Sequence, residues 1–214
     1  MQYHLIPQVR LKLEGAVSYQ DGKLKQVHLR QGSVDGACGA YSIMMTLLVL
    51  GQLDYDQLTT LARADGRSRA GKLLSSLEQY PGLFRQGMDV AELSQLLQNN
   101  FRQVLSFVPI TQSEGDPWKF AVDHVREGSP VIISMQGTGC GHWMVVIGVE
   151  LDDKDRVTRL LALDSSVDAP NICPWNAFIT PRRQKGHEYP FEWHSDGSSC
   201  YVQIEEAVAV WQRS

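Results

Sequence analysis

The chain lacks the features that mark membrane and nucleic-acid-binding proteins. No apolar run approaches the roughly 18 residues that a membrane span needs, and the first residues show no charged segment followed by an apolar one, as a secretory signal would. Basic residues are outnumbered, with 20 Lys and Arg against 24 Asp and Glu and a formal net charge of −4. This balance argues against nucleic acid or an anionic membrane as the main partner. We therefore expect a cytoplasmic protein, or one exported without a cleaved signal peptide.

Cysteine is scarce and does not form metal-binding pairs. The four cysteines, Cys38, Cys140, Cys173 and Cys200, show no CxxC pair and no zinc-finger spacing, which predicts free thiols. A zinc site of Cys38, Cys140, His142 and Cys173 is an alternative, but Cys140 and His142 are closer in the sequence than zinc ligands usually are. We expect no metal and no cofactor.

The order of the hydrophobic patterns indicates the fold class. Residues 3–30 alternate apolar and polar groups around a turn at Gln20-Asp21-Gly22, as a β-hairpin does. Helical patterns follow, and the last part of the chain reads as strands at 130–135, 143–149, 157–163 and 201–211. This order predicts one α+β domain over residues 1–214, with a helical half at about 38–128 packed on an antiparallel sheet at about 129–214.

Capping residues mark the expected helix ends. Asp54 with Gln57, and Asp89 with Glu92, have capping-box spacing, while Asp116 precedes a proline at a helix start. The first helix should end at Gly51, the second should place Leu61 and Ala62 on its apolar face, and the turn at Tyr80-Pro81-Gly82 should close the third. Residues 104–108 are expected to form a short strand.

Residues 167–199 are rich in Pro, Gly and aromatic side chains and are expected to form a long insertion without regular structure. Loops of that length are usually functional or flexible. The aromatic side chains either line a substrate cleft or attach the loop to the body of the protein.

The stretch from Gln31 to Leu50 has the pattern of a nucleophile at the start of a buried helix. A Gly-rich approach delivers Cys38 to the first turn of a helix that is apolar on nearly every face. Backbone N–H groups and the helix dipole at that end favour the thiolate, which is the nucleophilic form. Gly36 and Gly39 would leave room for a substrate backbone, and Gln31, seven residues before Cys38, would donate to an oxyanion. The alternative is a small cysteine packed in a core helix.

A cysteine nucleophile needs a base and a group that orients the base. His142 begins the most apolar strand pattern, and Asp164 ends the next one in LALDSS. If the two strands pair antiparallel, Asp164 reaches the level of His142 and accepts its Nδ1–H. The alternatives are a structural histidine and a turn-capping aspartate. Trp143 would either shield this pair from water or belong to the core, and Cys140 would either pack or act as a resolving thiol.

The quoted segments resemble the papain-like cysteine peptidases. The resemblance rests on Gln31, GACGAYS at 36–42, GHWMVVIGV at 141–149 and LALDSS at 161–166, and is closest to the bacterial double-glycine, bacteriocin-processing group. It implies a papain-like fold with Cys38 as nucleophile, His142 as base, Asp164 as its orienter and Gln31 as oxyanion donor. Gly36, Gly141 and Trp143 would contact substrate. Gln31 lies one residue further from the cysteine than is usual in those relatives.

The resulting hypothesis is a thiol hydrolase that cleaves a peptide or isopeptide bond in a peptide or protein substrate. Two alternatives remain open. The same acyl-enzyme would also serve an acyl transferase or a glutamine-deamidating effector or toxin, and the scaffold would also serve a non-enzymatic binding module whose contact surface is the 167–199 segment. The sequence makes no prediction of the oligomeric state.

Overall fold

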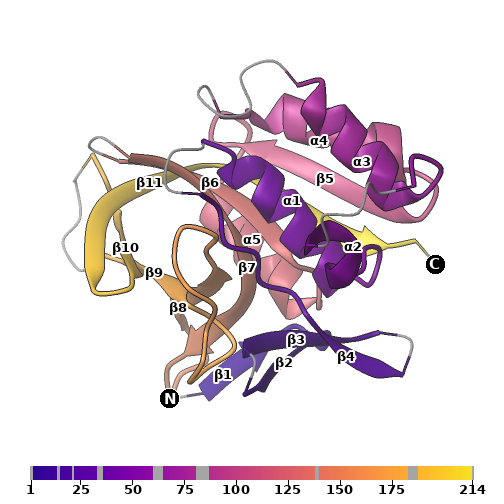
Figure 1. Ribbon diagram of the computed structural model, residues 1–214. Helices are drawn as coiled ribbons and strands as arrows, with labels where there is room; N and C mark the ends of the chain where they lie inside the picture. Colours follow the sequence, from indigo (N-terminus) through magenta and orange to yellow (C-terminus); the bar gives the residue numbers. More distant parts are fainter. Residues whose placement is uncertain are drawn as a thin grey trace.

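The computed structural model is an α+β protein in which helices pack against antiparallel sheets (Figure 1). It describes residues 2–13, 15–20, 22–32, 36–59, 65–80, 87–137, 140–182 and 188–213. The expected α+β class with antiparallel strands is confirmed. None of the helices in these ranges is both long and apolar enough to cross a membrane.

The larger sheet closes on itself. Its strand order is β1-β7-β6-β11-β10-β9-β8, and β7 also pairs with β8, so the strands from β6 to β11 form a ring. β1 extends β7, and β5 pairs with the last part of β11. The strands are β1 (Gln2–Leu5), β5 (Leu105–Thr111), β6 (Val131–Gly137), β7 (Cys140–Leu151), β8 (Val157–Leu163), β9 (Ala177–Pro181), β10 (Phe191–Ser195) and β11 (Ser198–Gln212).

The smaller sheet holds the predicted hairpin. Its strands are β2 (Val9–Lys12), β3 (Gly15–Gln20) and β4 (Lys23–Gln26), in the order β2-β3-β4. β3 and β4 join at the predicted turn, where Gly22 has a positive φ of 76°, and Asp21 lies outside the described residues. The interpretation of 3–30 as one hairpin was incomplete, because β1 pairs with β7 in the larger sheet.

Polar side chains cap the starts of three of the described helices. They are α1 (Cys38–Val49), α2 (Tyr55–Thr59), α3 (Arg69–Glu78), α4 (Val90–Phe101) and α5 (Pro117–Arg126). Asp89 and Glu92 form the predicted capping box of α4, and Asp116 accepts from the first turn of α5. Gly51 follows α1 with a φ of 68°, as expected of a residue that ends a helix. The apolar pair Leu61 and Ala62 and the predicted Pro81-Gly82 turn lie outside the described residues.

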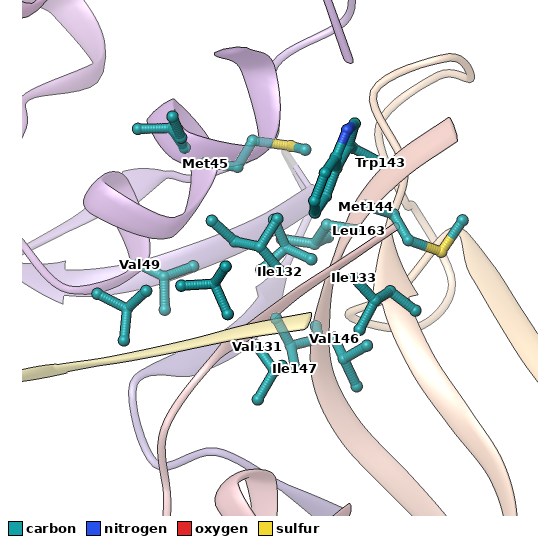
Figure 2. Packing of buried hydrophobic residues seen from close by; sticks show 14 of the residues in the cluster. Met45, Val49, Val131, Ile132, Ile133, Trp143, Met144, Val146, Ile147 and Leu163 are labelled. Carbon is teal, nitrogen blue, oxygen red and sulfur yellow. The ribbon is translucent and has the colours of Figure 1, made fainter. Parts of the chain in front are cut away.

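The core lies where α1 crosses β6 and β7. Val145, Val146 and Ile147 are consecutive residues of β7, and all three are fully buried, so this strand is covered on both faces. Figure 2 shows Met45 and Val49 of α1 in one cluster with side chains of β6 and β7. A helix and a strand that are apolar all round thus define the centre of the protein, as their patterns predicted.

The prediction that 167–199 lacks regular structure was wrong. The segment contains β9 and β10, which complete the ring between β8 and β11. Its Pro and polar residues obscured the alternation of these short strands, which are stabilised by pairing with residues far away in the sequence. The remaining predicted strands are present with slightly different ends.

Candidate active site

Cys38 is the first residue of α1, and its side chain reaches a cleft although the residue is only 8% exposed. Ala37 offers no side-chain cap, so no capping side chain takes up the N–H groups at this end of α1. Burial opposes ionisation of the thiol, but a hydrogen bond with His142, its positive charge and the backbone N–H groups of Trp143 and Gly39 lower the pKa of Cys38 overall. The thiol therefore ionises more readily than an ordinary cysteine.

His142 and Asp164 form an ion pair beneath the cleft. His142 Nε2 lies 2.7 Å from Asp164 Oδ1, and the aspartate is fully buried. The two residues meet because β7 pairs with β8 up to Val145 and Leu163, and Asp164 comes directly after this last pair. Sequence reasoning placed the two residues correctly on neighbouring strand ends.

The expected contact atom on His142 was wrong. Asp164 binds Nε2 rather than Nδ1, because it meets the ring at the end far from the β7 backbone. Nδ1 is then the nitrogen left for the hydrogen bond with the Cys38 thiol. The imidazole thus binds the carboxylate through Nε2 and leaves Nδ1 for the thiol.

The charges of this group support one another. Burial alone would lower the pKa of His142, but hydrogen bonds to Asp164 and Cys38 and their negative charges raise it to about 10. Burial alone would raise the pKa of Asp164, but His142 and the hydroxyl and N–H of Ser166 hold it below its ordinary value. These interactions therefore favour the thiolate, imidazolium and carboxylate forms together.

Gln31 is held in place by the residue after Asp164. Its backbone N–H donates to Ser165 O at 2.8 Å, and its side-chain Oε1 accepts from Ser165 Oγ at 2.8 Å. This second bond uses the acceptor end of the amide and leaves the Nε2 end as the donor. Gln31 and Cys38 line the same cleft.

The cleft has a volume of about 510 Å³ and contains six of the seven predicted site residues: Gln31, Gly36, Cys38, Gly141, His142 and Trp143. The seventh, Asp164, lies buried behind His142. Gly39 is not among the residues that line the cleft. A Cβ there would stand 3.3 Å from Met88 Cβ and 3.4 Å from Trp143 Cδ1, so the glycine permits close packing.

Trp143 closes one wall of the cleft. Its Nε1 donates to Met88 O at 2.8 Å, and the residue is only 4% exposed. A second tryptophan, Trp193, lies next to His142, with 6.0 Å between the two ring centroids. Trp193 is on β10, so the 167–199 segment supplies an aromatic side chain beside His142.

Sequence reasoning missed the acidic side of the cleft. Asp89 from the start of α4 and Glu205 and Glu206 from β11 line it together with Met88, Ser134 and Gln136. A β-bulge between Ile204 and Glu206 lets two consecutive glutamates border one cleft. Burial, with the charges of Asp89 and Glu205, raises the pKa of Glu206. A bulge depends on the partner strand, so alternation along β11 alone could not have indicated it.

The zinc alternative receives no support from the described side chains, which do not include that of Cys140. Cys173 lines a second cavity, of about 440 Å³, and is not among the residues that line the cleft with Cys38. Among the residues that the structure describes, no group of three or more His, Cys, Asp or Glu side chains could hold a metal ion. Cys38, Cys173 and Cys200 are free thiols, as predicted.

Comparison with protein-family models and with curated proteins gives no match. The chain is similar to a solved structure described as the crystal structure of UfSP from C. elegans, with 15% sequence identity and a TM-score of 0.45. The alignment covers 100% of this chain and 35% of that one, so this chain spans about a third of its length. The fold and the cleft themselves define an α+β protein with a candidate Cys–His–Asp triad.

Proposed function

We propose that this protein is a papain-like cysteine peptidase or related thiol hydrolase that cleaves a peptide or isopeptide bond. The observation that carries the proposal is one arrangement: Cys38 at the N-terminus of α1 and His142 line the same cleft, and His142 Nε2 lies 2.7 Å from Oδ1 of buried Asp164. A thiol, a base and a group that orients the base, in this order at one cleft, are the parts of nucleophilic acyl transfer.

In the first half-reaction the Cys38 thiolate attacks the carbonyl carbon, and a C–S bond forms while the carbonyl π electrons move to oxygen. The backbone N–H of Cys38 and Nε2 of Gln31 donate to this oxyanion. The C–N bond then breaks as the oxyanion collapses, and the His142 imidazolium gives its proton to the leaving amine. The product is a thioester on Cys38.

In the second half-reaction His142, now neutral, takes a proton from water as the water attacks the thioester carbon. The C–S bond breaks, the carboxylic acid leaves, and thiolate and imidazolium are restored. Asp164 stays ionised throughout and keeps the imidazole in place through Nε2.

The charge of the cleft indicates what kind of substrate fits. Asp89, Glu205 and Glu206 line it, and none of the described lining residues is Lys or Arg. Carboxylates that raise one another's pKa gain from a nearby cation. We therefore propose that substrates carry positive charge close to the bond that is cleaved.

Replacing both Glu205 and Glu206 by Gln is expected to change the charge preference of Cys38 towards small thiol reagents. The ratio of reaction rates with a cationic and an anionic methanethiosulfonate should fall about three- to tenfold, because two negative charges near the thiolate are removed. The measurement is mass spectrometry of Cys38 at low salt, with Asp153→Asn in the turn after β7 as the control. An unchanged ratio would contradict a charge-selective cleft.

A further inference from the structure

Asn176 is bound to both backbone polar groups of Asp164. Its Oδ1 accepts from Asp164 N at 2.7 Å, and its Nδ2 donates to Asp164 O at 2.8 Å. The same Nδ2 lies 3.0 Å from Asp168 O, and the backbone N–H of Asn176 donates to Ala162 O at 3.1 Å. One side chain thus pairs with Asp164 as a neighbouring strand would.

Asp164 needs such a partner because of its place in the fold. The pairing of β7 with β8 ends at Val145 and Leu163, so Asp164 is the first residue beyond the ladder. Its backbone is nevertheless buried, and buried N–H and C=O groups require partners. The Asn176 amide is the partner that reaches both groups, from the position just before β9.

His28 adds a second support from the other end of the chain. The residue is 5% exposed, and its Nε2 lies 2.9 Å from Asp164 O and 3.1 Å from Asn176 Nδ2. A carbonyl oxygen accepts only, so Nε2–H donates to Asp164 O. Burial lowers the pKa of His28. The negative charges of Asp164 and Asp168 act in the opposite direction, whereas the positive charge of Arg30, which pairs with Asp168, lowers the pKa further. His28 is therefore a neutral donor rather than a second base.

We propose that Asn176, assisted by His28, is the positioning residue of the catalytic aspartate. By holding the backbone of Asp164 on both sides, it helps to place Oδ1 at 2.7 Å from His142 Nε2. The same Oδ1 accepts from Ser166 N at 2.8 Å and from Ser166 Oγ at 2.7 Å, so Asn176 acts on the backbone and Ser166 on the carboxylate. The inference rests on the proposed function, because a positioning role has meaning only if Asp164 serves His142. Through Asn176 the 167–199 segment would support the reaction from outside the substrate cleft, because Asn176 does not line that cleft.

The consequence is measurable at Cys38. If the carboxylate shifts away from His142, the imidazolium loses a stabilising charge and the pKa of His142 falls. A weaker imidazolium stabilises the thiolate less, so the pKa of Cys38 rises. The acid limb of the rate of Cys38 alkylation against pH then moves to higher pH.

The experiment compares Asn176→Ala with Thr180→Ala, using iodoacetamide and per-cysteine mass spectrometry. Thr180 is a matched control, because its hydroxyl also donates to a backbone carbonyl from the same segment, Thr158 O at 3.1 Å, but does not touch Asp164. Asn176→Ala should move the acid limb up by about one pH unit, which slows alkylation about tenfold below it. Thr180→Ala should leave the acid limb unchanged even if this variant unfolds at a lower temperature than the unmodified protein.

A second pair of variants keeps the test decisive if Asn176→Ala does not fold. His28→Gln retains an N–H donor near the place of Nε2, whereas His28→Leu has none. His28→Leu should shift the acid limb in the same direction and His28→Gln should largely restore it. The inference is overturned if the acid limb of folded Asn176→Ala, or of His28→Leu, lies at the same pH as that of the unmodified protein. An unmodified protein whose acid limb lies at an ordinary thiol pKa would instead overturn the proposed function.

Discussion

Replacing His142 by Ala should slow alkylation of Cys38 at pH 6 by about two orders of magnitude. The His142 hydrogen bond and charge are the main contributions that lower the pKa of the thiol. Without them, burial and an ordinary thiol pKa of about 8.5 leave well under one per cent of Cys38 as thiolate at that pH. Thiolate forms above the lowered pKa of Cys38, and His142 stays protonated up to about pH 10, so the ion pair exists between these two values.

The measurement is the iodoacetamide rate constant of each cysteine, read by peptide mass spectrometry from pH 5 to 10. Cys173 and Cys200 serve as internal controls, because both are free thiols and neither lines the cleft. The rate constants of Cys173 and Cys200 should be the same in both proteins at every pH. A Cys38 rate at pH 6 that does not depend on His142 would show that the two residues are not coupled.

Replacing Asp164 by Ala should reduce the rate of amide hydrolysis by roughly a hundredfold or more. The change removes the acceptor of His142 Nε2 and leaves a buried imidazolium without its counter-charge. His142 would then favour the neutral form, and the thiolate would lose its partner. Asp164→Asn separates orientation from charge, because its Oδ1 still accepts from Nε2–H while the negative charge is gone.

We therefore expect Asp164→Asn to retain more activity than Asp164→Ala and to show an acid limb displaced to higher pH. The readouts are turnover of a cationic fluorogenic peptide amide and the pH profile of Cys38 alkylation, with thermal unfolding as the check on folding. Equal, full activity in Asp164→Ala would remove the aspartate from the mechanism.

The arrangement of the site was largely predictable, whereas its supports were not. The apolar helix after Cys38 and the two apolar runs ending near His142 and Asp164 define buried elements, and the pairing of β7 with β8 follows from the short turn between them. Which ring nitrogen meets Asp164 depends on the angle at which the two side chains approach. No spacing in the sequence encodes that angle.

The contacts that hold the site come from residues distant in the sequence. His28 and Asn176 reach Asp164 from 136 and 12 positions away, and neither lies in a pattern that distinguishes it from a surface polar residue. Ser165 and Ser166 were visible in LALDSS, and a polar pair after a strand-ending aspartate is a local signal that would have found them. The acidic wall depends on a bulge that forms only when β11 pairs with β6.

The most direct test of the central claim is to look for the cleaved bond itself. A peptide library that includes lysine-linked branched peptides is incubated with the protein in H₂¹⁸O, beside Cys38→Ala and Cys200→Ser, and the products are analysed by mass spectrometry. The account predicts new carboxyl termini with one ¹⁸O atom, made by the unmodified protein and Cys200→Ser and absent with Cys38→Ala, and enriched for Lys or Arg near the cut. The proposed hydrolysis would be contradicted if a protein with reactive Cys38 produced no ¹⁸O-labelled termini. It would also be contradicted if Cys38→Ala produced the same amount of labelled termini as the unmodified protein.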